Sequence, residues 1–416
     1  MAPTWDEILG RKMTANHLPD VAHHSLRLGC VGIVGYAQAM SDTVLENGSS
    51  VSPMVELVAA AGPEAVAGHD RVSELQRRGV KVFADLEAML GEAELDAAWV
   101  LAPIHLHEPL TRCCLDAGLH VLCEKPAAGS VAEVESMMQQ RDASGKVLLV
   151  GFQDVYDPSL LALKRRILDQ RLGKLRRITM HACWPRGEAY FQRNNWAGRL
   201  TVDGRPVYDS PLNNALSHYA HAGLFIAGEQ IPEAARLASG EVELYRAADI
   251  ESFDTVVVRG RTDTGVEMGI YFTHAAADNI GPRIDIEMER GNAVRLQDES
   301  IWQPADAEPE PIKPSRPHRV EMLEHFARRC LGENVGDQPG GRLEMARQHT
   351  RLVEAVHRAA EIVPIPDHAI EPVESHRGTV RAIPGIADAF SRAARDGFSL
   401  HELGLYGWTK PPSPLR

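Results

Sequence analysis

The sequence lacks a long hydrophobic run, since no stretch approaches the ~20 apolar residues that a helix needs to cross a bilayer. It also lacks a basic block, and 44 Lys and Arg against 57 Asp and Glu give a net charge of −13, which argues against a general nucleic-acid-binding protein. None of the six cysteines forms a CxxC pair, so neither a zinc site nor a redox dithiol is indicated. The chain begins without a basic segment followed by an apolar one, so we expect no signal peptide and a cytoplasmic protein with free thiols.

What is present is the composition of a globular protein. Hydrophobic residues make up 44% and charged residues 24% of the 416 residues, which is enough chain for two or three domains. This balance excludes a disordered chain, a collagen-like chain and a small disulfide scaffold.

Residues 26–152 alternate between buried strands and helices. Continuous apolar runs occur at 26–35, 55–62, 80–84, 97–103, 120–126 and 146–152. The clearest helix between them opens with a capping box of Ser130 and Glu133. This pattern predicts an α/β fold, a doubly wound parallel sheet of the Rossmann type, preceded by an arm at 1–25.

Residues 153–372 have a different pattern, which predicts an α+β domain with a mainly antiparallel sheet. We expect helices over 157–173 and 210–228 and near 319–331 and 342–361, with a strand at 174–184 and alternating strands over 235–297. Residues 373–416 form an extension whose apolar Leu403, Leu405, Tyr406 and Trp408 predict packing on the second domain.

The turn after the first strand, residues 32–40, is a degenerate dinucleotide motif. A GxGxxG turn lets the backbone approach a pyrophosphate at a helix N-terminus. Here only Gly35 fits, with Tyr36 beside it, while Ala37 replaces the second glycine and Met40 the third. An ordinary strand-to-helix turn is the alternative.

The end of the second strand leaves the cofactor open between NAD and NADP, with NAD slightly preferred. An acidic residue there would bind the ribose hydroxyls of NAD. The chain has Gly62, Pro63 and then Glu64, which could serve from two residues later, whereas Arg71 could accompany a 2′-phosphate.

Polar residues follow the next two strands at the edge where open α/β sheets bind ligands. Pro103 and His107 follow the fourth strand, and Glu124-Lys125-Pro126 follows the fifth. Only eight of the 44 basic residues are lysine. A buried lysine can lose its proton and an arginine effectively cannot. A lysine at this edge is therefore a candidate catalytic residue.

With these motifs, and with Gly151-Phe152 and Asp157-Pro158 after the sixth strand, residues 26–372 resemble the Gfo/Idh/MocA oxidoreductases, relatives of glucose-fructose oxidoreductase and inositol dehydrogenase. The resemblance implies a Rossmann domain, an open-faced second sheet and nicotinamide chemistry. It implies that Lys125 lies at the nicotinamide and the substrate. It also implies that Pro103, His107 and Glu124 line the cofactor pocket.

The family's second catalytic motif is an Asp or Asn followed four residues later by His on a helix, which Asn214 and His218 match. Residues at i and i+4 share a helix face, and His221 continues that stripe. The resemblance implies that His218 is the general base and that Lys125 stabilises the oxyanion. Asn214 is then a positioning group, since asparagine cannot be a base. A core histidine is the alternative for His218. His218, His221 and Asp209 lack further ligands, so we predict no metal site.

The segment 184–208 and its surroundings are the predicted substrate site, because stacking rings and planar donors suit a sugar ring. The candidates are Trp184, Arg186, Tyr190, Arg193, Asn194, Trp196, Asn213 and His221. A dimer or domain contact is the alternative for this loop.

The sequence therefore predicts an NAD(P)-dependent dehydrogenase of a sugar, glycoside or cyclic polyol. Two alternatives stay open: an oxidoreductive glycosidase that recycles bound NAD, and a non-catalytic, ligand-sensing regulator of the same fold. We expect a homodimer or homotetramer that binds a small carbohydrate or polyol, with neither nucleic acid nor a membrane as partner.

Overall fold

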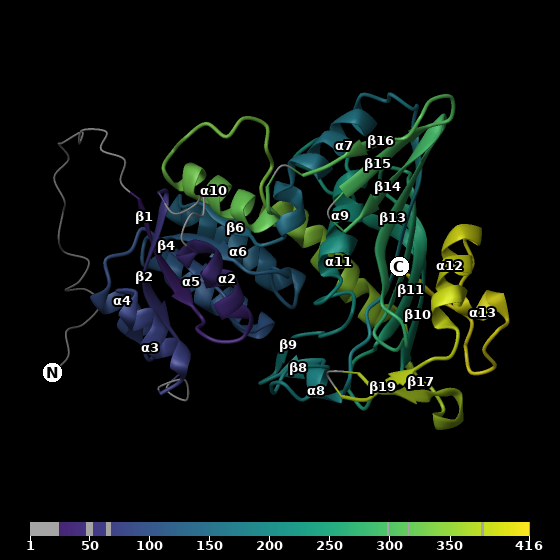
Figure 1. Ribbon diagram of the computed structural model, residues 1–416, viewed down its shortest axis with the longest axis horizontal. Helices are drawn as coiled ribbons and strands as arrows, with labels where there is room; N and C mark the ends of the chain where they lie inside the picture. The colour runs from purple at the N-terminus through teal and green to yellow at the C-terminus, as the bar shows by residue number, and fades with distance from the viewer. Residues whose placement is uncertain are drawn as a thin grey trace.

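The computed structural model describes residues 25–46, 53–63, 68–297, 299–314, 316–375 and 378–415. The predicted arm at 1–25 thus lies outside the described residues except for Ser25, and so does Glu64. Two sheets stand side by side, with helices between them (Figure 1).

The first sheet has six parallel strands in the order β3-β2-β1-β4-β5-β6, the strand order of a Rossmann fold. This confirms the predicted doubly wound sheet. Its strands are β1 (Leu26–Val31), β2 (Val55–Ala61), β3 (Lys81–Phe83), β4 (Ala97–Val100), β5 (His120–Cys123) and β6 (Leu148–Val150). Its helices are α2 (Tyr36–Leu45), α3 (Asp70–Arg77), α4 (Leu86–Glu92), α5 (His107–Asp116) and α6 (Val131–Ser144).

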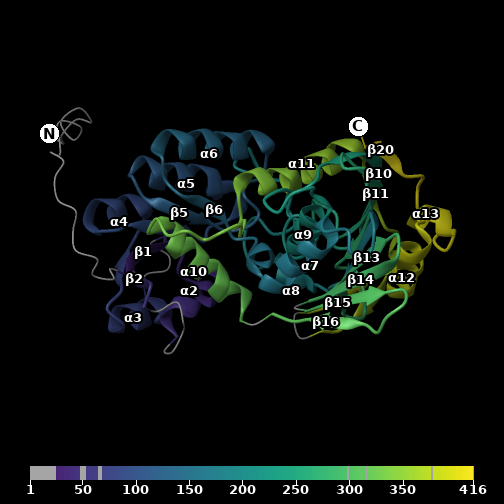
Figure 2. The ribbon, with the colours of Figure 1, turned by 90° about the horizontal axis from the view of Figure 1, so that it is seen from above.

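The central strands of this sheet are apolar throughout because helices cover both faces (Figure 2). Every residue of β4 is buried, including Trp99 at 0% exposure. The predicted capping box of α6 is confirmed: the Ser130 hydroxyl accepts from Glu133 N, and the Glu133 carboxylate accepts from Ser130 N.

The second sheet is mixed and mainly antiparallel, in the order β16-β15-β14-β13-β7-β12-β11-β10-β17, with β20 also beside β10. Only the β7–β12 and β10–β17 pairs in it are parallel among the described strands. Its strands are β7 (Leu175–Cys183), β10 (Leu237–Arg246), β11 (Thr255–Thr262), β12 (Glu267–Thr273), β13 (Ile280–Met288), β14 (Gly291–Leu296), β15 (Glu299–Pro304), β16 (Glu310–Ile312), β17 (Ile362–Pro364) and β20 (Ser413–Leu415). Two small hairpins are β8 (Thr201–Val202) with β9 (Arg205–Pro206), and β18 (Glu371–Val373) with β19 (Val380–Ala382).

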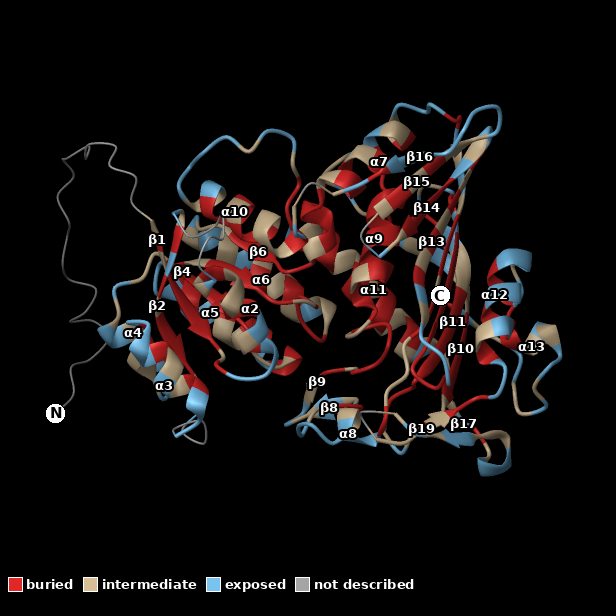
Figure 3. Cartoon of the chain, in the orientation of Figure 1, coloured by how far each residue is buried: buried red, intermediate tan, exposed pale blue. Residues whose placement is uncertain are grey.

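The helices α7 (Pro158–Leu168), α9 (Ser217–Ala227) and α11 (Leu343–Ala359) lie between the sheets or bridge them, whereas α10 (His318–Cys330) lies beside the first sheet (Figures 1 and 2). Although they come late in the chain, α10 contacts α2 and β2, and α11 contacts α6 and β6. Both therefore complete the packing of the first sheet, which periodicity along the chain did not indicate. Figure 3 shows the buried strands and helices running across both halves.

Helix α9 is shorter than the helix predicted over 210–228, because residues 211–216 form turns. Side chains in this segment bond to nearby backbone instead of leaving it to a helix. The Ser210 hydroxyl accepts from Asn213 N, and Asn213 Nδ2 donates to Val207 O at 2.9 Å. The expected helix over 157–173 likewise ends early, at Leu168, before Gln170 takes a φ of 52°.

The C-terminal extension packs on part of the outer face of the second sheet. Helices α12 (Ile386–Asp396) and α13 (Leu400–Leu403) lie on that face, and α12 contacts β7 and β12 (Figure 1). The Glu243 carboxylate accepts from Leu400 N at 2.9 Å, and Tyr271 OH donates to Phe398 O at 2.9 Å. Beside them the face is polar, as in the Arg283–Asp285 ion pair.

Candidate active site

Two glycines shape the turn after β1. Gly32 has a φ of +128°, and a Cβ there would lie 2.6 Å from Leu101 O, so no other residue fits. Gly35 has a φ of +64° and caps α2, and nothing lies within 4 Å of its Cβ position. Among the described residues no side chain caps this helix, which leaves its first N–H groups available to an anion. The sequence analysis missed Gly32.

The other two positions of the turn are buried. The Cβ of Ala37 is 3.1 Å from a Cβ built on Gly32, and Ala37 is 3% exposed. Ala37 is therefore a small buried residue that packs closely against Gly32. Met40 lies in the core at 1% exposure. Tyr36 instead remains 47% exposed at the turn.

Arg71 is not placed to receive a 2′-phosphate. Its side chain is 1% exposed and forms ion pairs with Asp42 at 2.7 Å and Glu74 at 2.9 Å. It also donates to the Ser41 hydroxyl at 2.8 Å. Gly62, at the end of β2, packs closely against Ile33, whose Cδ1 is 2.9 Å from the Cβ position of the glycine.

The ring of His107 joins two turns through its two nitrogens. Its Nδ1 is 2.7 Å from Pro126 O and its Nε2 is 2.8 Å from Ala102 O, so both ring nitrogens are occupied by backbone. Burial lowers the pKa of His107 to about 4, which leaves the ring neutral. The side chain thus has a structural role in holding these turns together, and Pro103 is half-buried beside it.

Glu124 is a buried carboxylate that organises the turn after β5. It accepts hydrogen bonds from Trp99 Nε1 and Tyr36 OH at 3.3 Å and from Lys125 N at 3.2 Å. Burial raises its pKa, against the charge of Lys125. A Cβ on Gly151 would lie 2.8 Å from Glu124 Oε1, so glycine at 151 gives the carboxylate its space.

Lys125 reaches across to the segment before α9. Its Nζ donates to Asn214 O at 3.1 Å and to Asn214 Oδ1 at 3.3 Å. An ammonium has three N–H groups, so one remains for another acceptor. Burial lowers the pKa of Lys125, while the carboxylates of Glu124 and Asp209 oppose that shift. The structure thus brings together two of the predicted catalytic residues.

His218 lies on α9, but Asn214 does not. Asn214 belongs to the preceding turn, so the expected shared helix face is wrong, although Asn214 still meets Lys125. The His218 Nδ1 is buried with no hydrogen-bond partner among the described residues. Burial and the charge of Lys125 lower the pKa of His218 to about 3, with Asp154 opposing, so the ring is neutral at pH 7.

Two predicted substrate residues lie in the core instead. The ring of His221 is stacked on Phe152 with centroids 4.0 Å apart, and His221 is 1% exposed. Asn213 is also 1% exposed and is bonded to Val207 O. Both side chains belong to the packing beneath the site.

The segment after β7 brings aromatic rings and guanidinium groups to Asn214. Tyr190, in the short helix α8 (Glu188–Phe191), has its OH 3.5 Å from Asn214 Nδ2. The guanidinium groups of Arg186 and Arg193 lie 4.9 Å and 3.7 Å from the Tyr190 ring centroid. Arg193 also lies 5.0 Å from the Trp196 ring. This part of the predicted substrate loop thus reaches Asn214, which Lys125 also contacts.

Trp184 and Asn194 have packing roles in the same segment. The ring of Trp184 packs edge-on against Tyr219 of α9, with centroids 5.8 Å apart. The Asn194 side chain accepts from Trp196 N at 3.1 Å and Ala197 N at 2.8 Å, which closes a turn.

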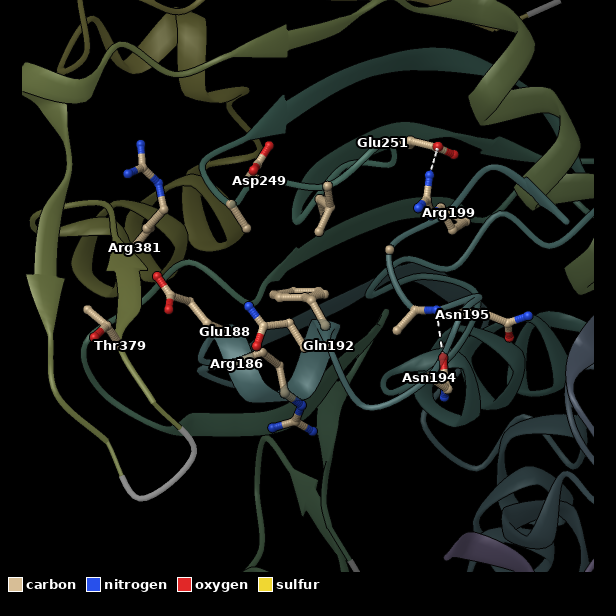
Figure 4. A pocket seen from close by; sticks show the side chains of 15 residues that line it. Arg186, Glu188, Gln192, Asn194, Asn195, Arg199, Asp249, Glu251, Thr379 and Arg381 are labelled. Atoms are coloured by element: carbon tan, nitrogen blue, oxygen red, sulfur yellow. Dashed lines mark hydrogen bonds and ion pairs between the residues drawn. The ribbon is translucent and has the colours of Figure 1, made fainter. Parts of the chain in front are cut away.

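A cavity of about 740 Å³ borders α8, and Figure 4 views it with Arg186, Asn194 and Asn195 among its lining side chains. Its further labelled lining residues are Glu188, Gln192, Arg199, Asp249, Glu251, Thr379 and Arg381. Asn194 therefore faces this cavity, while Tyr190 contacts Asn214.

Neither a metal site nor a membrane span emerges from the part of the chain that the structure describes. No group of three or more His, Cys, Asp or Glu side chains there could hold a metal ion. No helix there is long and apolar enough to cross a membrane.

Comparison with known proteins points to one family. A family model (GFO_IDH_MocA) described as "Oxidoreductase family, NAD-binding Rossmann fold" matches residues 27–152. Scyllo-inositol 2-dehydrogenase (NADP(+)) IolU of Bacillus subtilis is 33% identical over 24% of this chain and 30% of its own length. Myo-inositol 2-dehydrogenase of Thermotoga maritima is 26% identical over 53% of this chain and 63% of its own length. The chain thus spans less than a third of the first relative's length and less than two thirds of the second's.

A solved structure extends the similarity to both sheets. The WlbA dehydrogenase of Bordetella pertussis, in complex with NADH and UDP-GlcNAcA, superposes with a TM-score of 0.65 at 22% identity. The superposition covers 80% of this chain and 96% of that chain. At this identity the likeness establishes the fold.

Proposed function

We propose that this chain, which belongs to the Gfo/Idh/MocA family of oxidoreductases, is an NAD-dependent dehydrogenase acting on a secondary hydroxyl of a sugar, glycoside or cyclic polyol. The observation that carries the proposal is the contact of Lys125, at the end of β5, with Asn214, four residues before His218. Names of relatives such as the inositol dehydrogenases support the substrate class.

The residues at the glycine turn fit a dinucleotide. Gly32 and Gly35 hold the turn, the N-terminus of α2 is uncapped by any side chain, and no Cβ obstructs Gly35. When bound, the nicotinamide supplies a hydride acceptor for the carbinol carbon. NAD is preferred to NADP in this proposal because Arg71 is already paired with two carboxylates.

The chain's own residues handle the proton and the oxygen. His218, neutral at pH 7, accepts the hydroxyl proton. The remaining N–H of Lys125 bonds the same oxygen and stabilises its developing negative charge. Tyr190 and its flanking Arg186 and Arg193 contact the ring and hydroxyls of the substrate.

The test is a panel of inositols, sugars and glycosides with NAD and with NADP, following reduced nicotinamide and released aglycone together. We expect reduced NAD to accumulate with at least one cyclic polyol or sugar, faster than reduced NADP. Turnover with NADP alone would overturn the cofactor preference. Binding of NAD without turnover on the whole panel would favour a ligand-sensing regulator.

The cavity beside α8 favours a second candidate, an oxidoreductive glycosidase. It borders the substrate segment and offers about 740 Å³ lined by carboxylates, amides and guanidinium groups, which suits another sugar ring or an aglycone. In that case glycosides would release aglycone while reduced nicotinamide stays at the level of bound cofactor.

A further inference from the structure

We propose that Asp209 is a positioning residue whose carboxylate fixes the Asn214 side chain so that its amide oxygen faces Lys125. Asp209 lies just after the β8–β9 hairpin and is 3% exposed. The inference rests on the proposed function, since it assigns Asp209 a part in preparing the catalytic lysine.

Both carboxylate oxygens of Asp209 are engaged. Its Oδ1 accepts from Asn214 Nδ2 at 2.7 Å, and its Oδ2 accepts from Gly198 N at 2.6 Å. Gly198 has a φ of +70°, and a Cβ there would lie 2.6 Å from Ile250 Cγ2, so only glycine brings this N–H to Asp209. The carboxylate is thus held in place from the side opposite Asn214.

The chemistry of the two neighbours determines which way the amide of Asn214 points. A carboxylate only accepts hydrogen bonds and an ammonium only donates them. The amide NH₂ must therefore face Asp209, and the oxygen must face Lys125. With Asp209 removed, the reversed amide would present N–H to the ammonium and deprive Lys125 of Asn214 Oδ1, one of its two acceptors on Asn214.

Asp209 also acts on Lys125 through its charge. Burial raises the pKa of Asp209, while Gly198 N–H, the charge of Arg193, Asn214 and Lys125 favour the ionised form. The charged and titratable groups facing Lys125 are Glu124, Asp209 and Arg193, the Tyr36 ring, and the neutral rings of His107, His218 and His349. Because Asp209 raises the pKa of Lys125, removing its charge should lower that pKa further.

Asn214 lies between the ammonium of Lys125 and the carboxylate of Asp209. The negative charge of Asp209 thus sits one amide away from Lys125. A charge-transfer pair of variants tests this arrangement: Asp209→Asn removes the charge, and Asp209→Asn/Asn214→Asp puts it directly beside Lys125. Glu229→Gln, exposed after α9, is the matched control.

The first readout does not depend on activity. The chain has eight lysines, so ¹³Cε labelling gives few signals, and Lys125→Arg assigns the one that belongs to Lys125. We expect Lys125 to titrate at lower pH in Asp209→Asn and to return toward or above its original value in the double variant. An unchanged titration in a folded Asp209→Asn protein, with the same melting temperature as Glu229→Gln, would overturn the proposal.

The second readout is kinetic, on the substrate identified by the panel. In Asp209→Asn we expect kcat to fall about 10- to 100-fold, with the KM for NAD unchanged and the alkaline limb of the pH profile moved to lower pH. The double variant should recover the alkaline limb. If Asp209→Asn fails to fold, the double variant decides, and a lysine titration below that of the wild type there contradicts the proposal. Absence of turnover in the wild type would defeat the proposed function alone, because the lysine titration still tests Asp209.

Discussion

The two sides of the candidate site are built in different ways. On the Rossmann side, Gly32, Glu124 and Lys125 follow buried parallel strands, so the backbone of the sheet brings them to one edge. On the other side, Asp209 lies in irregular backbone and Asn214 in a turn, and side chain-to-backbone bonds hold both segments. One half of the site therefore depends on strand geometry and the other on individual polar contacts.

The largest expected effect concerns His218, the proposed proton acceptor on α9. His218→Asn keeps a polar side chain and removes the base, so we expect kcat to fall about 10²- to 10⁴-fold, with NAD affinity unchanged. Steady-state kinetics and calorimetric titration with NAD check this. His368→Asn, exposed in the described structure, is the control, and equal kcat in both variants would place the chemistry elsewhere.

The strand-built side should respond through stability and cofactor affinity. Gly32→Ala forces a Cβ to 2.6 Å from Leu101 O at a φ of +128°, so we expect a loss of about 4 kcal/mol in the free energy of unfolding and weaker NAD binding. Denaturant titration measures the loss. Gly91→Ala, in α4 with open space around its Cβ position, should be neutral or stabilising. A Gly32→Ala protein as stable as the wild type would contradict this account of the turn.

The contribution of His318 to the free energy of unfolding should depend on pH. His318 lies between Asp154 and Asp157, at 3.7 Å and 3.3 Å. Burial alone would lower the pKa of His318, but the carboxylates raise it to about 9. Because the folded pKa exceeds the unfolded value near 6.5, this stabilisation is fully present below about pH 6.5 and is lost as the pH rises through 9.

We therefore expect unfolding free energy to fall by about 3 kcal/mol between pH 6.5 and 9.5, and His318→Gln to flatten that decline. Urea titrations across this range measure it. A decline as steep in His318→Gln as in the wild type would show that another group titrates.

The smallest effect tests the turn before α9. Asn213→Ala removes the bond to Val207 O and should cost about 1–2 kcal/mol in the free energy of unfolding. Because residues 211–216 position Asn214, kcat should fall by more than it does in an equally destabilised variant elsewhere. Asn195→Ala, exposed, should leave stability unchanged. A loss of stability with unchanged kcat would mean that the turn does not position Asn214.

The same contrast explains what the sequence could predict. The doubly wound parallel sheet and the capping box of α6 followed from apolar periodicity and capping residues, and the joint site of Lys125 and Asn214 followed from the family resemblance. Side-chain direction did not follow: His221 continues the stripe of His218 yet stacks on Phe152 in the core. His107 sits in the right motif, but two backbone carbonyls occupy its ring.

Asp209 was open to prediction only as a neighbour of the histidines, because its partners Gly198 and Asn214 are brought to it by turns with no periodic pattern. Gly32 could have been predicted from the tight turn after β1, but the GxGxxG pattern draws attention to Gly35. Contacts that depend on irregular backbone are thus the part of this site that the sequence conceals.

The most direct measurement of the central claim is the turnover of Lys125→Ala on the best substrate of the panel, with the exposed Lys81→Ala as control. We predict a loss of at least about 100-fold in kcat for Lys125→Ala, with NAD still bound, and an unchanged Lys81→Ala. Equal turnover in the two variants would contradict the assignment of Lys125, and with it the proposed mechanism.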